Sequence, residues 1–346
     1  MIGNKVKVVV VEDSAFMRLL LTDILSASPK VELIGSAENG KDGVELVKEK
    51  EPDVVLMDMN MGEFDGLYAV KRIMAEKPTP ILILSAVGNT DLQPIFEALN
   101  AGAVDYMNKP SRSSARIRSV EVNLISKILN ASQANTSGFG IKKQIESEPI
   151  KLNDPNKKFE VLCIGASTGG PAAVEQILKN LPGSISVPVV VAQHMPNHFI
   201  SQFAQRLNQI SKFSVGVASH GQSPVSGNAY ILPGDSNTIF GLDSEGGVQF
   251  QKHDKVFKDY NEPSINALFD SAATIFKNKA LGVLLTGMGK DGAKGLKEIK
   301  NSGGFTIAQD ESSSVIFGMP KVAAEIGAVS KTLHIKEISR FLSKRL

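Results

Sequence analysis

A serine flanked by glycines ends an apolar run near the middle of the chain. The run is Phe159 to Ile164, and the serine is Ser167 in Gly165-Ala166-Ser167-Thr168-Gly169. A β-strand that ends in Gly-x-Ser-x-Gly turns sharply enough to present the hydroxyl to a base, with backbone N–H groups facing an oxyanion. The same short motif fits a turn around a phosphate, or a tight connection from strand to helix. The motif alone leaves these three interpretations open.

A serine nucleophile needs a base, and the chain has five histidines. His194 directly follows the apolar run Val187 to Gln193, so it would emerge beside Ser167 if the two strands are parallel neighbours. His198 lies four residues further on, which suggests a metal pair, but Pro196 argues against one helix carrying both and no glutamate stands beside His194. A structural histidine at a strand end is the other alternative. The rest lie in polar or helical contexts: His220, His253 and His334.

Asp291 is the candidate carboxylate that would hold such a base in one tautomer and stabilise its imidazolium. It follows a strand-like run, Leu281 to Leu285, and lies in a glycine-rich loop, Thr286 to Ala293, that leads into a helix. The glycines also allow a backbone N–H, such as that of Met288, to act as an oxyanion donor. Asp291 fits equally well as the N-cap of the following helix.

Acidic side chains in the first 110 residues also follow strand-like runs. The strand ends carry Glu12 and Asp13, Asp58, Ser85 and Lys109. In a doubly wound sheet these positions share the carboxyl edge, and three converging carboxylates would repel one another unless a hard cation such as Mg²⁺ lay between them. Such a site can accept a phosphoryl group on Asp58, with Mg²⁺ and Lys109 neutralising its oxygens. The preference of acidic residues for turns explains only part of this pattern.

Apolar runs alternate with helix-like stretches on both sides of a polar segment, and this alternation predicts two α/β domains with parallel sheets. The first half offers strands at 6–11, 31–37, 54–57, 81–85 and 104–107, and the second at 161–164, 187–192, 229–232, 281–285 and 305–308. Ser, Asn, Gln and Lys accumulate between them. We therefore expect domains at 1–125 and 159–346, joined by a linker at 126–158.

Composition narrows the classes of protein. Lys plus Arg number 38 against 36 Asp plus Glu. The net charge is therefore too small to attract the whole protein to nucleic acid or to an anionic membrane. The single cysteine, Cys163, excludes an internal disulfide and a cysteine-based zinc site, and suits a reducing compartment. Neither a signal-peptide pattern nor a bilayer-length apolar stretch is present. We expect a cytoplasmic protein without membrane insertion.

The first half resembles the response-regulator receiver domain, over roughly residues 5 to 125. The matching segments are Val11-Glu12-Asp13-Ser14, Met57-Asp58-Met59, Asp65-Gly66, Leu84-Ser85-Ala86, Ala101 to Tyr106 and Lys109-Pro110. The resemblance implies a flavodoxin-like fold with Asp58 as phosphoacceptor and Lys109 on the phosphate. It also implies Mg²⁺ held by Glu12, Asp13, Asp58 and the Asn60 carbonyl, with Ser85 and Tyr106 as the switch pair. Gly62 departs from the usual proline, which would loosen the loop and change the lifetime of the phosphoryl group.

From Phe159 onward the chain resembles the chemotaxis protein-glutamate methylesterase (glutaminase) family. The matching segments are Ile164 to Gly170, Gln193-His194-Met195-Pro196, Tyr230 to Asp235, Thr286 to Ala293 and Gln309 to Pro320. The order Ser, His, Asp differs from that of α/β-hydrolases. The resemblance implies a Rossmann-like hydrolase domain with nucleophile Ser167, base His194 and carboxylate Asp291. Thr168 and the Met288 amide would lie near the oxyanion, and hydrolysis would need no cofactor.

Two departures from this family concern substrate choice. Asn261-Glu262-Pro263-Ser264 stands where His-Arg-Pro-Ser is common, and Asn237 stands where a histidine often follows the Pro-Gly segment. Glu262 reverses a charge near the expected substrate groove, which would change the charge pattern of the receptor helices that are recognised.

The implied activity is phosphorylation-gated hydrolysis of γ-glutamyl methyl esters, and deamidation of glutamines, on methyl-accepting chemotaxis receptors. A histidine kinase would phosphorylate Asp58 and so relieve a block by the receiver. One alternative is a transcription regulator with a DNA-binding output, but the second half is large, glycine-rich and not notably basic. The other is a nucleotide-binding domain, which lacks both the Gly-x-Gly-x-x-Gly spacing and a P-loop lysine.

Overall fold

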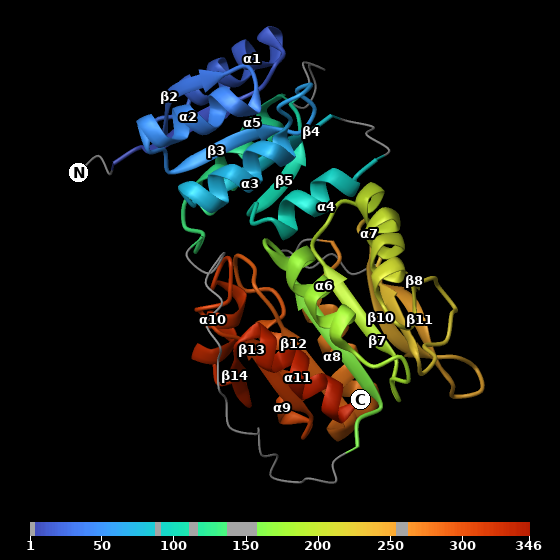
Figure 1. Cartoon of the computed structure of the whole chain (residues 1–346). Coiled ribbons are helices and arrows are strands. Elements are labelled where there is room, and N and C mark those ends of the chain that lie inside the picture. Colours follow the sequence, from blue (N-terminus) through green and yellow to red (C-terminus); the bar gives the residue numbers. More distant parts are fainter. Residues whose placement is uncertain (1–3, 87–90, 111–116, 137–157, 254–261) are drawn as a thin grey trace. The chain divides into compact units, whose positions relative to one another are not determined.

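The structure is a computed structural model that describes residues 4–86, 91–110, 117–136, 158–253 and 262–346. The chain divides into two compact units, residues 1–143 and 144–346, and each is described by itself (Figure 1). Within the described ranges, no helix is both long enough and apolar enough to cross a membrane.

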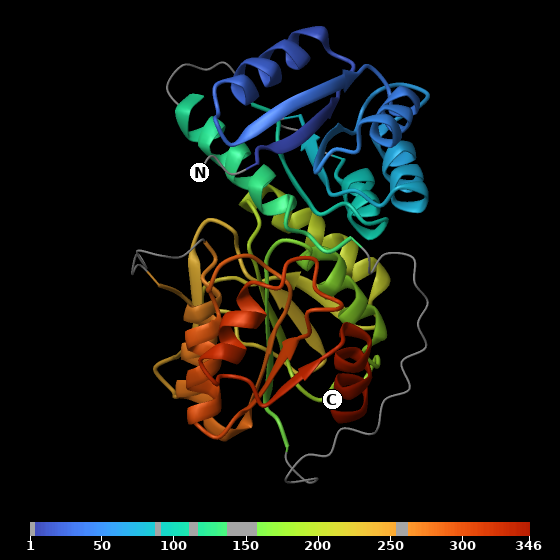
Figure 2. The ribbon, with the colours of Figure 1, turned by 90° about the vertical axis from the view of Figure 1, so that its left-hand side faces the viewer.

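The N-terminal unit contains a five-stranded parallel sheet in the order β2-β1-β3-β4-β5. Its strands are β1 (Val6–Val11), β2 (Val31–Ala37), β3 (Val54–Asp58), β4 (Ile81–Ser85) and β5 (Asp105–Asn108). Its helices are α1 (Ala15–Ser26), α2 (Gly40–Lys50), α3 (Gly66–Glu76), α4 (Gln93–Asn100) and α5 (Ile117–Ala131). Helices α2, α3 and α4 pack in a row on one face, and α1 and α5 lie on the other (Figure 2). Strands β3 and β4 are wholly buried, as their unbroken apolar runs require.

Helix α5 continues to Ala131, beyond the domain boundary that we placed at residue 125. Of the expected linker, residues 137–157 lie outside the described ranges. The start of the linker is therefore helical.

The C-terminal unit contains a seven-stranded parallel sheet in the order β14-β13-β12-β6-β7-β9-β8. Its strands are β6 (Val161–Ala166), β7 (Val189–Gln193), β8 (Ser214–Val217), β9 (Asn228–Ile231), β12 (Ala280–Leu284), β13 (Phe305–Gln309) and β14 (Lys331–Leu333). The chain builds the sheet outward from β6 on one side and later returns to pair β12 with its other side. In α/β sheets, ligands bind where the strand order reverses in this way.

Helices cover both faces of this sheet (Figure 2). One face carries α6 (Gly170–Asn180), α7 (Asn197–Ile210) and α11 (Ile335–Arg345). The other carries α8 (Ile265–Phe276), α9 (Ala293–Asn301) and α10 (Met319–Glu325), and the short 3-10 helix η1 (Lys277–Lys279) follows α8. Strands β6, β7 and β12 are wholly buried because both of their faces are covered.

An antiparallel hairpin of β10 (Asn237–Leu242) and β11 (Val248–His253) packs against α8. Phe240 and Phe250 stack with ring centroids 5.6 Å apart and are almost fully buried in the core that includes Phe269 of α8. The hairpin thus adds an aromatic layer over the helix that begins beside Asp291.

Candidate functional site

Ser167, His194 and Asp291 come from three neighbouring strands. Ser167 follows β6, His194 follows β7, Asp291 lies in the loop after β12, and β6 runs between the other two. His194 Nδ1 lies 3.2 Å from Ser167 Oγ, and His194 Nε2 lies 2.8 Å from Asp291 Oδ2. A proton on Nε2 is held by the carboxylate, which leaves Nδ1 to accept a proton from the hydroxyl. The three side chains form the hydrogen-bonded series that a nucleophile, a base and an orienting acid require.

The Asp291 carboxylate is buried and accepts hydrogen bonds from the start of α8. Its Oδ2 accepts from the Ile265 N–H at 2.8 Å, and its Oδ1 accepts from the N–H groups of Asn266 at 3.0 Å and Gly292 at 2.9 Å. The N-cap residue of the following helix, α9, is Gly292 rather than Asp291. Asp291 therefore lies at the N-terminus of a different helix, α8, whose dipole favours its negative charge.

The turn that carries Ser167 is fixed by backbone conformation and by a buried amide. Gly169 has φ +75°, and a Cβ there would lie 2.6 Å from Val315, so only glycine fits. Gln193 Nε2 donates to the carbonyl oxygens of Ser167 at 3.0 Å and His194 at 3.1 Å. Gln193 thereby connects the two turns that present the serine and the histidine.

The loop after β12 lies directly against Ser167. A Cβ on Gly287 would lie 2.6 Å from Ser167 Cβ, so the loop approaches the serine as closely as a glycine allows. The next residue, Met288, is 41% exposed, and its N–H finds no acceptor among the described residues. An N–H group of this loop that lacks an acceptor is a candidate donor to an oxyanion.

Two buried polar residues that we did not single out from the sequence hold this loop in place. Thr286 Oγ1 donates to the Thr168 carbonyl at 3.0 Å and accepts from the Ile316 N–H at 2.9 Å. Gln309 Oε1 accepts from the Thr286 N–H at 2.8 Å. A polar residue that ends or follows an apolar strand was the signal available for both, as it was for Gln193.

The metal alternative for His194 receives no support from its surroundings. His198 lies in the first turn of α7, is exposed, and its ring contacts that of Phe199. In the described part of the chain, only the acidic group Glu12, Asp13 and Asp58 brings three metal-binding side chains together.

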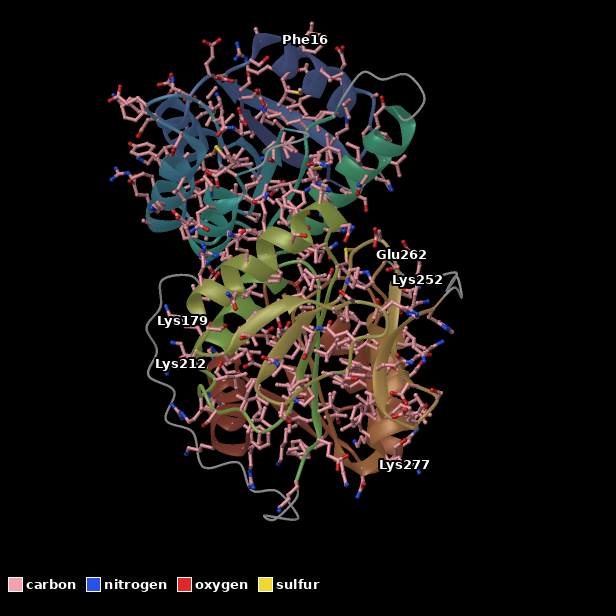
Figure 3. The ribbon with its side chains drawn as sticks, turned by 90° about the vertical axis from the view of Figure 1, so that its right-hand side faces the viewer. Phe16, Lys179, Lys212, Lys252, Glu262 and Lys277 are labelled. Carbon is pink, nitrogen blue, oxygen red and sulfur yellow. The ribbon has the colours of Figure 1, made fainter. Side chains whose placement is uncertain are left out.

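Both departures from the family pattern lie near the start of α8. Asn237 is buried, and its Oδ1 accepts from the Ser264 N–H at 2.8 Å. Ser264 is the N-cap of α8 and accepts from the Ala267 N–H at 3.2 Å. Glu262 is exposed (Figure 3), whereas Asn261 lies outside the described ranges. Asn237 thus stabilises the backbone that holds Asp291, and Glu262 adds a negative charge at the surface.

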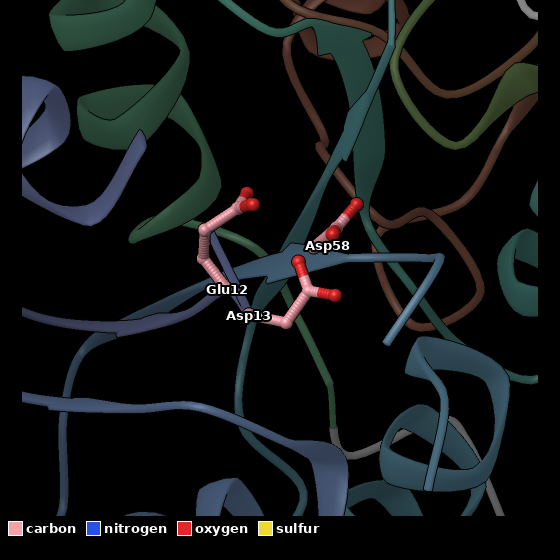
Figure 4. A group of neighbouring side chains, drawn as sticks. All are labelled: Glu12, Asp13 and Asp58. Atoms are coloured by element: carbon pink, nitrogen blue, oxygen red, sulfur yellow. The ribbon is translucent and has the colours of Figure 1, made fainter. Parts of the chain in front are cut away.

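In the N-terminal unit, Glu12, Asp13 and Asp58 converge at the carboxyl edge of the sheet (Figure 4). One oxygen of each lies within 4.8 Å of the others. Lys109 follows β5, and its Nζ lies 2.8 Å from Glu12 Oε2 and 2.9 Å from Asp58 Oδ1. Acidic oxygens so closely grouped match the ligands that Mg²⁺ prefers.

Burial and neighbouring charges shift the pKa values of Glu12 and Lys109. Burial raises the pKa of Glu12, and the Asp58 charge adds to this although the Lys109 hydrogen bond opposes it. Burial opposes the charge of Lys109, but its hydrogen bonds to both carboxylates prevail and raise its pKa. The carboxylates outnumber the lysine, so the group as a whole favours one further cation.

The remaining residues expected at this site lie in β4 and β5 or in the loop after β3. Asn60 is exposed two residues after Asp58, and Ser85 ends β4 with its Oγ buried and without a partner among the described residues. Tyr106 is buried within β5, and burial raises its pKa well above the usual value. Gly62 has φ +72°, which proline cannot adopt, so the departure matches the loop conformation.

Comparisons with known proteins cover almost the whole chain. The family models "CheB methylesterase" and "Response regulator receiver domain" match residues 162–342 and 8–121. A protein-glutamate methylesterase/protein-glutamine glutaminase of Methanococcus maripaludis is 39% identical over 95% of each chain, and one of Thermotoga maritima is 38% identical over 98% of each. The crystal structure of the Thermotoga maritima CheB methylesterase catalytic domain has a TM-score of 0.52 and 37% identity, covering 55% of this chain and 100% of that one.

Proposed function

The chain belongs to the CheB methylesterase family and carries a receiver domain, and on that premise we propose that it is a chemotaxis hydrolase whose Ser167 is activated by phosphorylation of Asp58. Its substrates are γ-glutamyl methyl esters and glutamines of methyl-accepting chemotaxis receptors. The observation that carries the hydrolytic part is the pair of hydrogen bonds at His194, whose Nδ1 pairs with the Ser167 hydroxyl and whose Nε2 pairs with Asp291.

In the first step Ser167 Oγ attacks the ester carbonyl and its proton passes to His194 Nδ1. Negative charge develops on the carbonyl oxygen, where the Met288 N–H and Thr168 are the proposed donors. The C–OCH₃ bond then breaks, and His194 returns the proton to give methanol. Water attacks the acyl-enzyme through the same base, which releases glutamate and restores the serine. A glutamine side chain follows the same course with ammonia as the leaving group.

Asp291 acts on this reaction through His194. Its charge stabilises the imidazolium that forms when His194 takes the proton. Its hydrogen bond with Nε2 keeps Nδ1 directed at the serine. The N–H groups at the start of α8 hold the carboxylate in position through hydrogen bonds.

In the receiver, Asp58 is the proposed phosphoacceptor and Lys109 pairs with the added phosphoryl oxygens. Glu12, Asp13, Asp58 and the Asn60 carbonyl would hold Mg²⁺, which supplies positive charge to the phosphoryl group. Ser85 and Tyr106 would report the new charge to the rest of the chain by changing their hydrogen bonding. The unphosphorylated receiver is proposed to block Ser167, with phosphorylation shifting a two-state equilibrium toward the open form.

The proposed partners are a chemotaxis histidine kinase, which supplies the phosphoryl group, and the chemotaxis receptors. We place the reaction in the cytoplasm, with neither nucleic acid nor membrane insertion involved. The exposed Glu262 would favour receptor helices with basic residues beside the methylated glutamate.

The test is methanol release from methyl-labelled receptor membranes, with and without a small phosphodonor. The change Ser167→Ala should abolish methanol release and leave phosphorylation of Asp58 intact. Normal turnover by this variant would overturn the assignment of the nucleophile. Turnover that ignores the phosphodonor would overturn the gating and leave the esterase standing.

A further inference from the structure

A pocket of about 340 Å³ lies between the β10–β11 hairpin and α8, outside the hydrolytic site. It is lined by Ile239, Phe240, His253, Ala267, Asp270, Ser271, Thr274 and Ile275. None of these side chains belongs to the Ser167, His194 and Asp291 series.

The hydroxyl groups in the pocket lining, those of Ser271 and Thr274, both make hydrogen bonds to backbone groups. Ser271 Oγ accepts from the Phe240 N–H at 3.1 Å and donates to the Leu268 carbonyl at 2.9 Å. Thr274 Oγ1 donates to the Asp270 carbonyl at 2.9 Å. The hydroxyl groups of Ser271 and Thr274 therefore both donate to carbonyl groups of the protein and are not available as donors to a ligand.

The carboxylate of Asp270 is the one acidic group in the pocket lining. It makes no hydrogen bond or ion pair with any other described residue, although it is partly buried. Burial raises its pKa to about 6, and the charges of Glu298 on α9 and of Asp291 add to the effect. His253 of β11 also lines the pocket. At neutral pH Asp270 is mostly ionised and repelled by both acidic neighbours, so a cation placed beside it would relieve both costs.

We propose that this pocket binds an organic cation, an ammonium or guanidinium head on an aliphatic stem, with Asp270 as its counter-ion. Ile239, Ala267 and Ile275 provide apolar walls for the stem. A bare divalent metal does not fit, because it needs several oxygen ligands and the lining supplies a single carboxylate. An anion would meet the charge of Asp270.

The same chemistry is found in a free small molecule and in an arginine or lysine side chain of another protein. We use butylguanidinium as the probe for the first and a short arginine-containing peptide for the second. Butylurea has a similar shape without charge and serves as the neutral comparison. A peptide that binds much more tightly than butylguanidinium identifies a protein side chain as the occupant. Equal affinities identify a free molecule, and both results support the cation site.

Binding to the full-length protein is measured by calorimetric titration at pH 7.5. Butylguanidinium should bind at least about tenfold more tightly than butylurea, the difference expected for a charge-assisted hydrogen bond. The change Asp270→Asn should remove this preference, whereas Glu245→Gln, at the exposed tip of the hairpin, should leave it unchanged. Affinity should also fall as the pH drops below about 6, because Asp270 then becomes protonated.

A second variant tests the pocket in case Asp270→Asn does not fold. Thr274 is exposed at the rim, so Thr274→Tyr should block the pocket without touching the carboxylate. Equal binding of butylguanidinium and butylurea, or unchanged binding by Asp270→Asn, would overturn the proposal.

Discussion

At the scale of single residues, the Asp291 carboxylate is the most heavily engaged group of the hydrolytic site. Its two oxygens accept from His194 Nε2 and from the N–H groups of Ile265, Asn266 and Gly292. Every partner is a donor, so the position requires two acceptor oxygens and a negative charge. A neutral amide of the same shape provides only one such oxygen.

The change Asp291→Asn should therefore reduce turnover by about ten-thousand-fold, because the wrong tautomer of His194 is favoured. It should also lower the free energy of unfolding by about 1 to 3 kcal/mol, since the new NH₂ group faces backbone N–H donors. Methanol release and urea denaturation measure the two effects. Ser167→Ala is the control, because it should abolish turnover with little loss of stability. A fully active Asp291→Asn enzyme would contradict the proposed role.

The raised pKa of Asp270 predicts how the free energy of unfolding depends on pH. Its pKa is raised from 3.8 to about 6, so the folded protein binds the proton more tightly than the unfolded chain, and stability falls as the pH rises from about 4 to 6. The change Asp270→Asn should then raise the free energy of unfolding above pH 6.5, by about 1 kcal/mol after allowance for solvent screening.

Near pH 3.5 the gain from Asp270→Asn should vanish, because both residues are neutral there. Denaturation at the two pH values checks this, and Glu245→Gln is the surface control. A stabilisation of equal size at both pH values would show that the carboxyl charge is not its cause.

At the scale of elements, the start of α8 links the hairpin to the hydrolytic site. Asn237 of β10 holds the Ser264 N–H, and the next two N–H groups hold Asp291. A displacement of this helix end would therefore reach His194 through a continuous set of hydrogen bonds.

The change Asn237→Ala should lower the free energy of unfolding by about 1 to 3 kcal/mol, because it leaves a buried N–H unpaired. We also expect a several-fold lower kcat with KM nearly unchanged, if Asn237 affects the reaction only through Ser264 and the backbone that holds Asp291. Ser236→Ala, the adjacent residue, is the matched control. An effect on KM alone would place Asn237 in substrate binding instead.

The loop after β3 offers a test of backbone conformation. Gly62 has φ +72° and nothing within 4 Å of an added Cβ, so Gly62→Ala should cost about 1 kcal/mol through the backbone alone. Gly62→Pro should cost more, because proline cannot adopt this φ. Gly216→Ala in β8 also meets open space, but at a position where no positive φ is required, and is the control. Equal effects at the two glycines in urea denaturation would contradict this explanation.

Much of this arrangement could be predicted from the sequence, because parallel strands place their carboxyl ends at one edge. That rule placed Ser167 beside His194 on adjacent strands. It does not reach Ile265, since nothing local signals that the start of α8 would meet the loop after β12. The β10–β11 hairpin was also missed: its strands mix polar and apolar residues, as β10 does from Asn237 to Leu242, and they join neither parallel sheet.

At the scale of the whole molecule, the proposed activity depends on a charge added in one unit and a reaction in the other. The change Asp58→Asn should leave basal methanol release unchanged and remove its stimulation by a phosphodonor. The reason is that an asparagine cannot accept the phosphoryl group, so no negative charge is added beside Lys109 and Glu12. Methanol release with and without acetyl phosphate measures this, and stimulation that survives in Asp58→Asn would show that another residue accepts the phosphoryl group.

The position of β6 at the centre of its sheet means that the site is complete only when β6 has paired with a strand on each side. Asp291 follows His194 by 97 residues, and β12 pairs with β6 only after β7, β8 and β9 have been synthesised. Pairing between distant segments is slow because loop-closure entropy must be overcome first. A chain in which β6 has paired with β7 but not with β12 would therefore lack the acid beside its serine and histidine. Activity recovered during refolding should therefore appear only once β12 has paired with β6.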